Sequence, residues 1–428
     1  MKQRVSFYTF GCRLNQSETA SIQNSLKAQG YQVVDVADTP DIVVINTCTV
    51  TQSSDADTRH LVYRVNRLNP SARIALVGCQ AQIQKEQLGQ LPNVRWIVGN
   101  ARKMDLVSVF NEYPDPKHPQ VITPAIGREA FSCPTASVDF DHTRANIKIQ
   151  DGCDFFCSFC AIPFARGRAR SRVFEDILKE AALLITAGHK ELILTGINIG
   201  TYAHQDKNLV HVIEALEAIK DLQRVRISSI EPTTIAPAIL DMMSAGHKLC
   251  RHLHIPLQSG DDEILREMKR KYTVDEFRDF IDQAELQVPQ ICIGTDVMVG
   301  FPGENDKHFE NTVEFLKEAP IHYLHVFSYS PRQEAKSRFL PIASPKVIHE
   351  RSRVLRDLSA HKRHLFHKSL LGRTQFVLFE KPKGDGWQNG LTDNYVRVKV
   401  KTSLDLFNQI LPVRLQRTDG QAVEGELC

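Results

Sequence analysis

Three cysteines, Cys153, Cys157 and Cys160, lie within eight residues and constrain this chain more than any other feature. They follow an apolar, strand-like run at residues 147–150 and precede a basic stretch. Cysteine thiolates hold iron–sulfur clusters, and a cubane cluster normally takes four of them. Three local ligands would leave one iron free to bind another molecule. Residues 151–160 therefore predict a loop that holds a [4Fe–4S] cluster with an open iron.

Zinc is the alternative metal for this loop, because it also binds cysteine. Structural zinc sites take four ligands, usually from two closely spaced Cys or His pairs. No second pair follows this loop in the sequence. The ligand count and spacing therefore favour an iron–sulfur cluster.

The composition indicates a multidomain protein that binds metal through cysteine. The chain has 428 residues and 42% hydrophobic content, enough for two or three domains with large cores. The net charge is only +3, so contact with nucleic acid would need local basic patches. We find neither a secretory signal nor an apolar run of transmembrane length. Ten cysteines then favour metal binding and free thiols, and we expect a protein of the reducing cytoplasm.

The first part of the chain, residues 4–99, alternates strand-like with helix-like segments. The helical patterns cover residues 17–29 and 55–68, the first with a polar cap expected at Asn15 or Ser17. The apolar, strand-like runs are residues 5–10, 42–46 and 73–77. This rhythm predicts a parallel-sheet α/β domain over residues 1–111.

Each of these three predicted strands is followed by a cysteine, namely Cys12, Cys48 and Cys79. Because the carboxyl ends of parallel strands share one edge of a sheet, these thiols should converge. We predict that they hold a second cluster. The alternative is three ordinary buried thiols, since free cysteine is often a core residue.

The middle of the chain predicts a second α/β unit. Residues 112–142 contain five prolines and little periodicity, which predicts an interdomain linker. Beyond it we expect strands at residues 146–150, 191–195, 224–228, 252–256, 291–299 and 323–328. Six β/α repeats predict an incomplete parallel (β/α)6 barrel over residues 143–372, which includes a trailing basic helix.

Sites in such barrels lie at the carboxyl ends of the strands. Gly196 there would let the backbone approach a cofactor closely, whereas Asn198, Ser229 and Glu231 offer hydrogen-bonding groups. Asp296 lies on the fifth predicted strand. We therefore predict these five residues to bind the cofactor; the alternative is that they are ordinary turn or cap residues.

Two stretches are strongly basic. Residues 165–172 contain Arg166, Arg168, Arg170 and Arg172, which could guide a phosphate or carboxylate ligand, or form a salt-bridged surface loop. Residues 351–373 predict a basic amphipathic helix, with Leu365 among its apolar residues. Such a helix lies on a membrane or presents its charges to RNA, and the domain that follows favours RNA.

The last part of the chain, residues 373–428, predicts a small five-stranded β-barrel. Turns are expected around residues 384–386 and at Asn389-Gly390, and strands at residues 375–380, 394–400 and 410–415. Trp387, Tyr395 and Phe407 are candidates for stacking on bases, with at least one of them expected in the core.

Two groups of motifs resemble known families. The loop of Cys153, Cys157 and Cys160 resembles that of the radical S-adenosylmethionine (SAM) enzymes. Residues 9–18, 45–51 and 77–82 resemble the N-terminal domain of the methylthiotransferases within that superfamily, and the match extends over essentially the whole chain. The resemblance implies two [4Fe–4S] clusters, one on each cysteine triad, and S-adenosyl-L-methionine at the open iron. It also implies that the terminal barrel is a TRAM-like RNA-binding domain.

The sequences Asn-Thr-Cys-Thr-Val-Thr and Gly-Cys-x-x-Asn-Gln are most similar to the MtaB-type subgroup. This resemblance implies an enzyme that inserts a methylthio group at C2 of N6-threonylcarbamoyladenosine, at tRNA position 37 beside the anticodon. The implied partners are the tRNA anticodon loop and a reductant protein such as a flavodoxin or ferredoxin, with no DNA and no membrane. No catalytic acid or base is predicted, because placement of the target carbon dominates hydrogen abstraction.

Three alternatives stay open. The substrate could be isopentenyladenosine in tRNA or an aspartate of a ribosomal protein. In a different class, the chain could be a non-catalytic iron–sulfur sensor that binds RNA.

Overall fold

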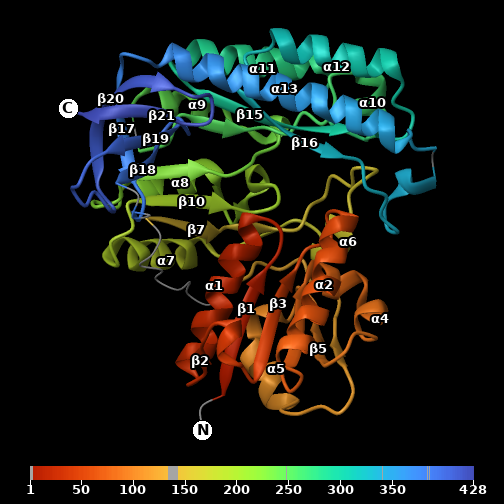
Figure 1. The fold of residues 1–428 in the computed structure, drawn as a ribbon. Coiled ribbons are helices and arrows are strands. Elements are labelled where there is room, and N and C mark those ends of the chain that lie inside the picture. The colour runs from red at the N-terminus through yellow and green to blue at the C-terminus, as the bar shows by residue number, and fades with distance from the viewer. Residues whose placement is uncertain (1–2, 134–142, 247, 340, 383, 385) are drawn as a thin grey trace.

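The computed structural model describes residues 3–133, 143–246, 248–339, 341–382, 384 and 386–428. Figure 1 shows three parts in chain order. A red-to-orange α/β domain is followed by a yellow-to-cyan barrel, and a small blue β-barrel packs at one end of that barrel. This arrangement confirms the predicted fold class.

The first domain is built on a six-stranded parallel sheet with the order β2-β1-β3-β4-β5-β6. All six residues of the central strand β3 are buried, as expected for a parallel strand covered on both faces. The strands are β1 (Arg4–Thr9), β2 (Gln32–Val33), β3 (Ile42–Thr47), β4 (Arg73–Gly78), β5 (Val94–Val98) and β6 (Gln120–Ile122).

Helix α1 (Arg13–Ala28) begins earlier than predicted, with Cys12 as its N-cap and no side-chain cap hydrogen bond. The expected caps at Asn15 and Ser17 are wrong, because both residues lie inside the helix. Their side chains make tertiary hydrogen bonds instead: Asn15 donates to the Thr47 carbonyl at 3.2 Å, and Ser17 donates to the Asn146 carbonyl at 3.3 Å. The other helices of this domain are α2 (Gln52–Leu68), α3 (Cys79–Ile83), α4 (Lys85–Leu88) and α5 (Leu106–Glu112).

The proline-rich stretch predicted as a linker contributes to the first sheet. Its strand β6 pairs in parallel with β5, and Trp96 lies opposite Gln120. The stretch then continues to Cys133 without another regular element of its own apart from an isolated bridge at Phe131. Pro134 and the remainder of the predicted linker lie outside the described residues.

All six predicted strands of the second domain are present. They form two parallel halves, β13-β10-β7 and β14-β15-β16, joined by an isolated parallel bridge between Val225 and Leu249. Within the described residues β7 and β16 do not pair, so the barrel is open on that side. The strands are β7 (Arg144–Lys148), β10 (Glu191–Thr195), β13 (Arg224–Ile227), β14 (His252–His254), β15 (Cys292–Val299) and β16 (Tyr323–Ser328).

One large apolar core lies between these strands and the helices outside them. Leu192 and Leu194 of β10 are fully buried in it, whereas Thr195 lies at the strand's carboxyl end. The outer helices are α7 (Phe174–Thr186), α8 (Leu209–Glu217), α9 (Pro237–Ser244), α10 (Asp262–Glu267), α11 (Val274–Gln287) and α12 (Asp306–Glu318).

The first domain covers the open side of the barrel. Helix α1 contacts β7 through the Ser17 hydrogen bond, and Figure 1 shows the two elements side by side. Beyond β16, the Gln52 amide donates to the Ser330 hydroxyl at 3.0 Å, and Arg332 pairs with Asp55 at 2.5 Å. The domain therefore contacts the chain at both free edges of the incomplete barrel.

The predicted basic helix is α13 (Pro345–Ser369), but not all of its charges face outward. Arg351 is buried and pairs with Glu304 at 2.5 Å and with Asp306 at 2.7 Å. Lys362 donates to two backbone carbonyls at the end of α12, and Leu365, expected on the apolar side, is 50% exposed. Within the predicted stretch, residues 351–373, the exposed arginines and lysines are Arg353, Arg356, Lys368 and Arg373.

The C-terminal part is the predicted five-stranded barrel, closed in the order β17-β18-β19-β21-β20. The turn expected at Asn389-Gly390 is wrong, because both residues lie inside β18. A Cβ on Gly390 would lie 2.5 Å from a Val377 methyl group, so this glycine permits close strand packing. The strands are β17 (Thr374–Phe379), β18 (Trp387–Thr392), β19 (Arg397–Lys401), β20 (Ile410–Thr418) and β21 (Val423–Leu427).

Tyr395 of this barrel faces the neighbouring domain. Its ring stacks on His252, with centroids 4.2 Å apart, and its hydroxyl accepts a hydrogen bond from Arg13 at 2.9 Å. Tyr395 is therefore an interface residue and not a free base-stacking platform. Trp387 and Phe407 are half-buried. In the described part of the chain, no helix combines the length and apolar character needed to cross a membrane.

Candidate active site

The cysteine loop follows the short strand β8 (Gln150–Asp151) and ends at helix α6 (Ile162–Arg166). Its entry requires glycine, because Gly152 has φ +71° and a Cβ there would lie 2.0 Å from the Arg168 carbonyl oxygen. Phe156, inside the loop, also adopts a positive φ of +51°. The three cysteines are thus presented by a compact loop whose path depends on one glycine.

We expect Gly152→Ala to displace the loop and to remove the iron that it is predicted to hold, because the new methyl group meets backbone atoms that cannot rotate away. Iron content after anaerobic reconstitution should fall by about four per chain, the content of one cubane cluster. Gly372→Ala is the matched control, since Gly372 also has positive φ (+80°) but no atom within 4 Å. Full iron content in Gly152→Ala would contradict the expectation.

Each sulfur of this loop accepts one hydrogen bond. Such donors suit anionic sulfur, because hydrogen bonds to cluster thiolates stabilise them and tune their potential. The donors are the Phe155 amide to Cys153 at 3.4 Å, the Ile162 amide to Cys160 at 3.4 Å, and the Arg270 guanidinium to Cys157 at 3.3 Å.

The three thiols are also close enough to influence one another. Burial, together with the neighbouring Cys157, raises the pKa of Cys153 to about 11 and that of Cys160 to about 12. Cys153 and Cys160 are therefore protonated at neutral pH unless a cation is present. A bound metal reverses this preference, because it stabilises the thiolates directly. The donor set therefore fits an iron–sulfur cluster.

Sequence analysis did not single out Arg270, which lies in the loop after α10. Its side chain is 3% exposed, and its guanidinium donates to Cys157, to the Glu231 carboxylate and to the Pro256 carbonyl at 3.2 Å. Burial raises the pKa of Glu231, and Arg270 opposes that shift. Arg270 thus links a predicted cluster ligand to a predicted cofactor-binding carboxylate. No local pattern marks it, because it stands between two other basic residues in a turn.

Gly196 and Asn198 lie beside the base of the cysteine loop. A Cβ on Gly196 would lie 3.0 Å from the Gln150 carbonyl oxygen, and the Asn198 amide donates to the Gln150 side chain at 2.8 Å. The Asn198 side-chain nitrogen is buried and has no hydrogen-bond partner. Ser229 is half-buried just beyond β13. All three residues lie just beyond the carboxyl ends of β10 and β13, where ligand sites of such barrels lie.

Asp296 is held by two histidines. Its carboxylate lies 2.9 Å from His254 Nε2 and 3.4 Å from His325 Nδ1. Burial raises the pKa of Asp296, but the two histidines together hold it well below the ordinary value. Asp296 and Cys160 both line a pocket of about 200 Å³, together with Val50 from the first domain. Elements of both domains therefore border this pocket.

The other cysteine triad lies at one edge of the first sheet. Cys12, Cys48 and Cys79 follow β1, β3 and β4, which are neighbours in that sheet. A Cβ on Gly11 would lie 2.8 Å from the Cys48 sulfur, which shows how close the first two strand ends are. Burial, together with the neighbouring Cys79 and Cys12, raises the pKa of Cys48 to about 11. The predicted convergence of the three thiols is thus present.

Comparison with known proteins now identifies the family. Residues 147–316 match the radical SAM superfamily, and residues 4–99 match the family described as uncharacterized protein family UPF0004. The chain is 34% identical to threonylcarbamoyladenosine tRNA methylthiotransferase MtaB of Bacillus subtilis, over 99% of this chain and 96% of that protein. The chain belongs to the radical SAM methylthiotransferase family.

Other relatives carry related names. The protein named MtaB in Aquifex aeolicus is 36% identical over 92% of this chain and 96% of its own length. A tRNA-2-methylthio-N(6)-dimethylallyladenosine synthase of Thermodesulfovibrio yellowstonii is 30% identical over 100% of this chain and 99% of that protein. Among solved structures, the radical SAM methyltransferase TsrM of Kitasatospora setae matches with a TM-score of 0.56 at 13% identity, covering 76% of this chain and 73% of that one. That likeness supports the fold alone.

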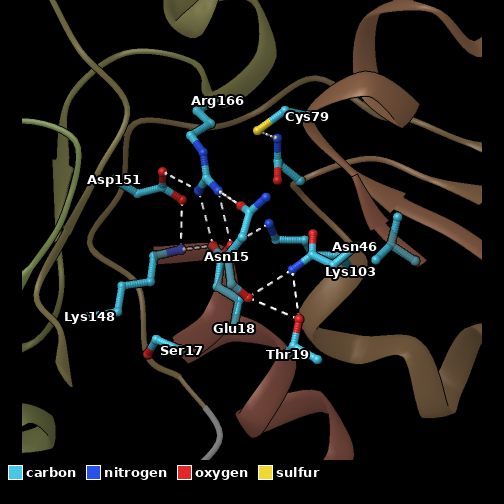
Figure 2. Close-up of polar contacts among 12 residues, drawn as sticks. Asn15, Ser17, Glu18, Thr19, Asn46, Cys79, Lys103, Lys148, Asp151 and Arg166 are labelled. Carbon is cyan, nitrogen blue, oxygen red and sulfur yellow. Dashed lines mark hydrogen bonds and ion pairs between the residues drawn. The ribbon is translucent and has the colours of Figure 1, made fainter. Parts of the chain in front are cut away.

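In this methylthiotransferase, a buried ion network joins the two cysteine-bearing domains (Figure 2). Glu18 of α1 accepts from Lys103 at 2.5 Å, from Lys148 at 2.7 Å and from Arg166 at 3.0 Å. Asp151 accepts from Lys148 at 2.7 Å and from Arg166 at 2.9 Å. All five side chains are at most 6% exposed. We call this set the interdomain ion network.

The network lies beside both cysteine triads. Asp151 is two residues before Cys153, and Arg166 donates to Asn15, on the first turn of the helix that Cys12 caps. Next to it, the Asn100 side chain lies 3.6 Å from the Cys79 sulfur and donates to the Ala165 carbonyl at 2.7 Å. The network therefore sets the position of one triad relative to the other.

This finding corrects the expectation for the basic stretch at residues 165–172. Arg166 belongs to the interdomain ion network, and Arg172 is buried against Asp176 and Glu180. Arg170 pairs with Asp151 at 3.3 Å, and only Arg168 is substantially exposed, at 44% of its side chain. The stretch is neither a ligand guide nor a surface loop, because most of its charge is neutralised inside the protein.

Proposed function

We propose that this enzyme inserts a methylthio group at C2 of N6-threonylcarbamoyladenosine at tRNA position 37. The observation that carries the proposal is the pocket that both cysteine-bearing domains share. Cys160 of the barrel loop lines it, and so does Val50, two residues beyond Cys48. A radical source and a sulfur source must meet on one carbon, and a shared pocket satisfies that need.

In this proposal Cys153, Cys157 and Cys160 hold a [4Fe–4S] cluster with an open iron for SAM. Cys12, Cys48 and Cys79 hold a second [4Fe–4S] cluster. When bound, the first cluster would supply the electron that cleaves SAM to a carbon radical able to remove the C2 hydrogen, and the second would supply the sulfur for the methylthio group. The protein supplies placement and exclusion of water, and no side chain is assigned as an acid or base.

The side chains at the strand ends are suited to the amino-acid part of SAM. The guanidinium of Arg270 can pair with a carboxylate, and Glu231 can accept from an ammonium group. The unpartnered side-chain nitrogen of Asn198 offers a further donor, and Gly196 and Ser229 also lie at the strand ends. Asp296 is committed to two histidines, so we assign it to the pocket wall, where its charge orients His254.

Contact with tRNA is assigned to the exposed basic residues of α13 and to the terminal barrel. Arg353 is 68% exposed in its side chain, and Lys399 lies 5.3 Å from the ring centroid of Trp387. An anticodon loop suits such a surface, because its unstacked bases can be presented to a pocket. A reductant protein such as a flavodoxin or ferredoxin is expected to deliver the electron that SAM cleavage consumes.

Mass spectrometry of tRNA nucleosides from a strain that lacks this gene tests the substrate. We expect N6-threonylcarbamoyladenosine to persist without its methylthio group, while methylthio-isopentenyladenosine, if the strain makes it, stays unchanged. Loss of the isopentenyl product instead would assign the enzyme to the other nucleoside.

A separate measurement excludes a non-catalytic sensor. Protein reconstituted anaerobically should release 5′-deoxyadenosine when dithionite and SAM are added. A sensor without radical chemistry would release none.

A further inference from the structure

A second cavity lies at the opposite end of the barrel lumen, where all three parts of the chain meet. It has a volume of about 280 Å³ and lies beside the first residues of β15 and β16, Cys292 and Tyr323. Its lining contains four arginines and, among the described residues, no aspartate or glutamate. We call it the arginine cavity; its arginines are Arg13, Arg144, Arg363 and Arg397, from α1, β7, α13 and β19.

Two of these arginines are neutralised by the same carboxylate. Glu380 pairs with Arg144 at 2.6 Å and with Arg397 at 3.3 Å. For Arg13, no carboxylate of the described residues lies within 4.0 Å; its guanidinium donates to the Tyr395 hydroxyl at 2.9 Å. Arg13 is thus a half-buried cation that has unused N–H donors and, among the described residues, no carboxylate partner.

The wall beside Arg13 is aromatic. His252, only 3% exposed, stacks on Tyr395 and lies 2.9 Å from the Tyr323 hydroxyl. Burial holds the pKa of His252 well below the ordinary value, and the nearby cation of Arg226 lowers it further. The imidazole is therefore neutral, and the positive charge of the cavity comes from its arginines. Such a cavity is suited to an organic anion.

The arginine cavity is connected to the proposed reaction site in two ways. Arg13 is the residue after Cys12, at the first turn of α1. Within the lumen, Tyr323 lies 3.1 Å from His254, which lies 2.9 Å from Asp296 in the pocket beside Cys160. His325 lines the arginine cavity and lies 3.4 Å from Asp296, which lines the pocket beside Cys160, so the two cavities are neighbours.

We propose that Arg13 binds the carboxylate of the threonylcarbamoyl substituent and thereby selects this nucleoside over adenosines with uncharged substituents. The proposal rests on the proposed function and extends it to substrate choice. A guanidinium binds a carboxylate through two parallel hydrogen bonds. A site built around an unpaired charge also discriminates strongly against a ligand that lacks the matching group, because the charge is then left unpaired.

Equilibrium binding to anticodon stem-loop RNAs tests this inference. The RNAs carry threonylcarbamoyladenosine, its methyl ester or isopentenyladenosine at position 37. We expect the wild-type protein to bind the free acid about 10- to 100-fold more tightly than the other two, the usual weight of a charged hydrogen-bonded pair. Arg13→Gln should bind all three equally, and Arg13→Lys should keep part of the preference.

Arg353→Gln is the matched control, because it removes an exposed arginine outside the cavity. It should change the affinity for all three RNAs by one common factor. The same uniform loss in Arg13→Gln, with the acid preference intact, would mean that Arg13 binds a backbone phosphate, and would overturn the proposal. So would a wild-type protein that binds acid and ester equally. A wild-type enzyme that methylthiolates only the isopentenyl RNA would refute the proposed function instead, so the two failures are distinguishable.

Discussion

Replacing Cys153, Cys157 and Cys160 together with alanine is expected to abolish reductive cleavage of SAM and to leave about four irons per chain, the content of one cubane cluster. The reason is geometric. These three cysteines lie on one loop of the barrel, whereas the remaining triad lies at the edge of a separate sheet with its own core. Loss of the first site should not prevent the second from assembling.

The reciprocal variant, with alanine at Cys12, Cys48 and Cys79, should also retain about four irons per chain. It should still release 5′-deoxyadenosine, because the barrel loop, Arg270 and the strand ends are unchanged. The methylthiolated nucleoside should be absent from both variants, since radical and sulfur must meet on one carbon.

The measurements are iron content, 5′-deoxyadenosine and modified nucleoside, all made anaerobically on the same preparations. Cys428→Ala is the control, because Cys428 is exposed and belongs to neither triad. The two-cluster proposal fails if the variant at Cys12, Cys48 and Cys79 retains about eight irons, or if it still makes methylthiolated product.

Replacing Glu18 with glutamine should destabilise the contact between the two cysteine-bearing domains by about 3–5 kcal/mol, the usual cost of removing one partner from a buried ion pair. Glutamine keeps the shape of the side chain but leaves three buried cations, Lys103, Lys148 and Arg166, with Asp151 as their only remaining carboxylate in the interdomain ion network. Hydrogen exchange of α1 and β7 should increase accordingly.

Denaturation followed by Trp96 fluorescence, in a Trp387→Phe background, reports on the first domain without signal from the terminal barrel. Glu318→Gln is the matched control. Glu318 pairs with Arg278 at 3.2 Å but is 71% exposed, so its loss should cost less than about 1 kcal/mol. An equally small effect for Glu18→Gln would show that the interdomain ion network does not hold the domains together.

The contribution of Glu18 to the stability of the protein should also depend on pH. Burial by itself raises the pKa of Glu18, but Arg166, Lys103 and Lys148 hold it well below the ordinary value. A lowered folded-state pKa stabilises the protein above the unfolded value of about 4.3, and that contribution is lost as the pH falls through the folded-state pKa. The difference in the free energy of unfolding between wild type and Glu18→Gln should therefore have its full size at neutral pH and should become smaller below pH about 4.

Local patterns in the sequence were sufficient for the fold class. Strands such as β10 and β16 were located because apolar runs between helical patterns report burial directly. Cysteine spacing marked the loop that carries Cys153, Cys157 and Cys160, since three thiols within eight residues have few uses. The convergence of Cys12, Cys48 and Cys79 also followed from sequence, because parallel strands end at a common edge.

Roles that depend on distant partners were decided only by the tertiary structure. The sequence predicts Arg166 as a surface or ligand-guiding arginine. In the structure it pairs with Glu18, which is 148 residues away in the chain. The sequence predicts Tyr395 as a base-stacking residue, but in the structure His252 stacks on its ring. No sequence pattern marks Arg270, which the structure places beside Cys157. Local sequence determines which backbone conformation and burial a residue favours. Packing between domains determines which charged partner lies next to a side chain, and no short-range sequence pattern predicts that partner.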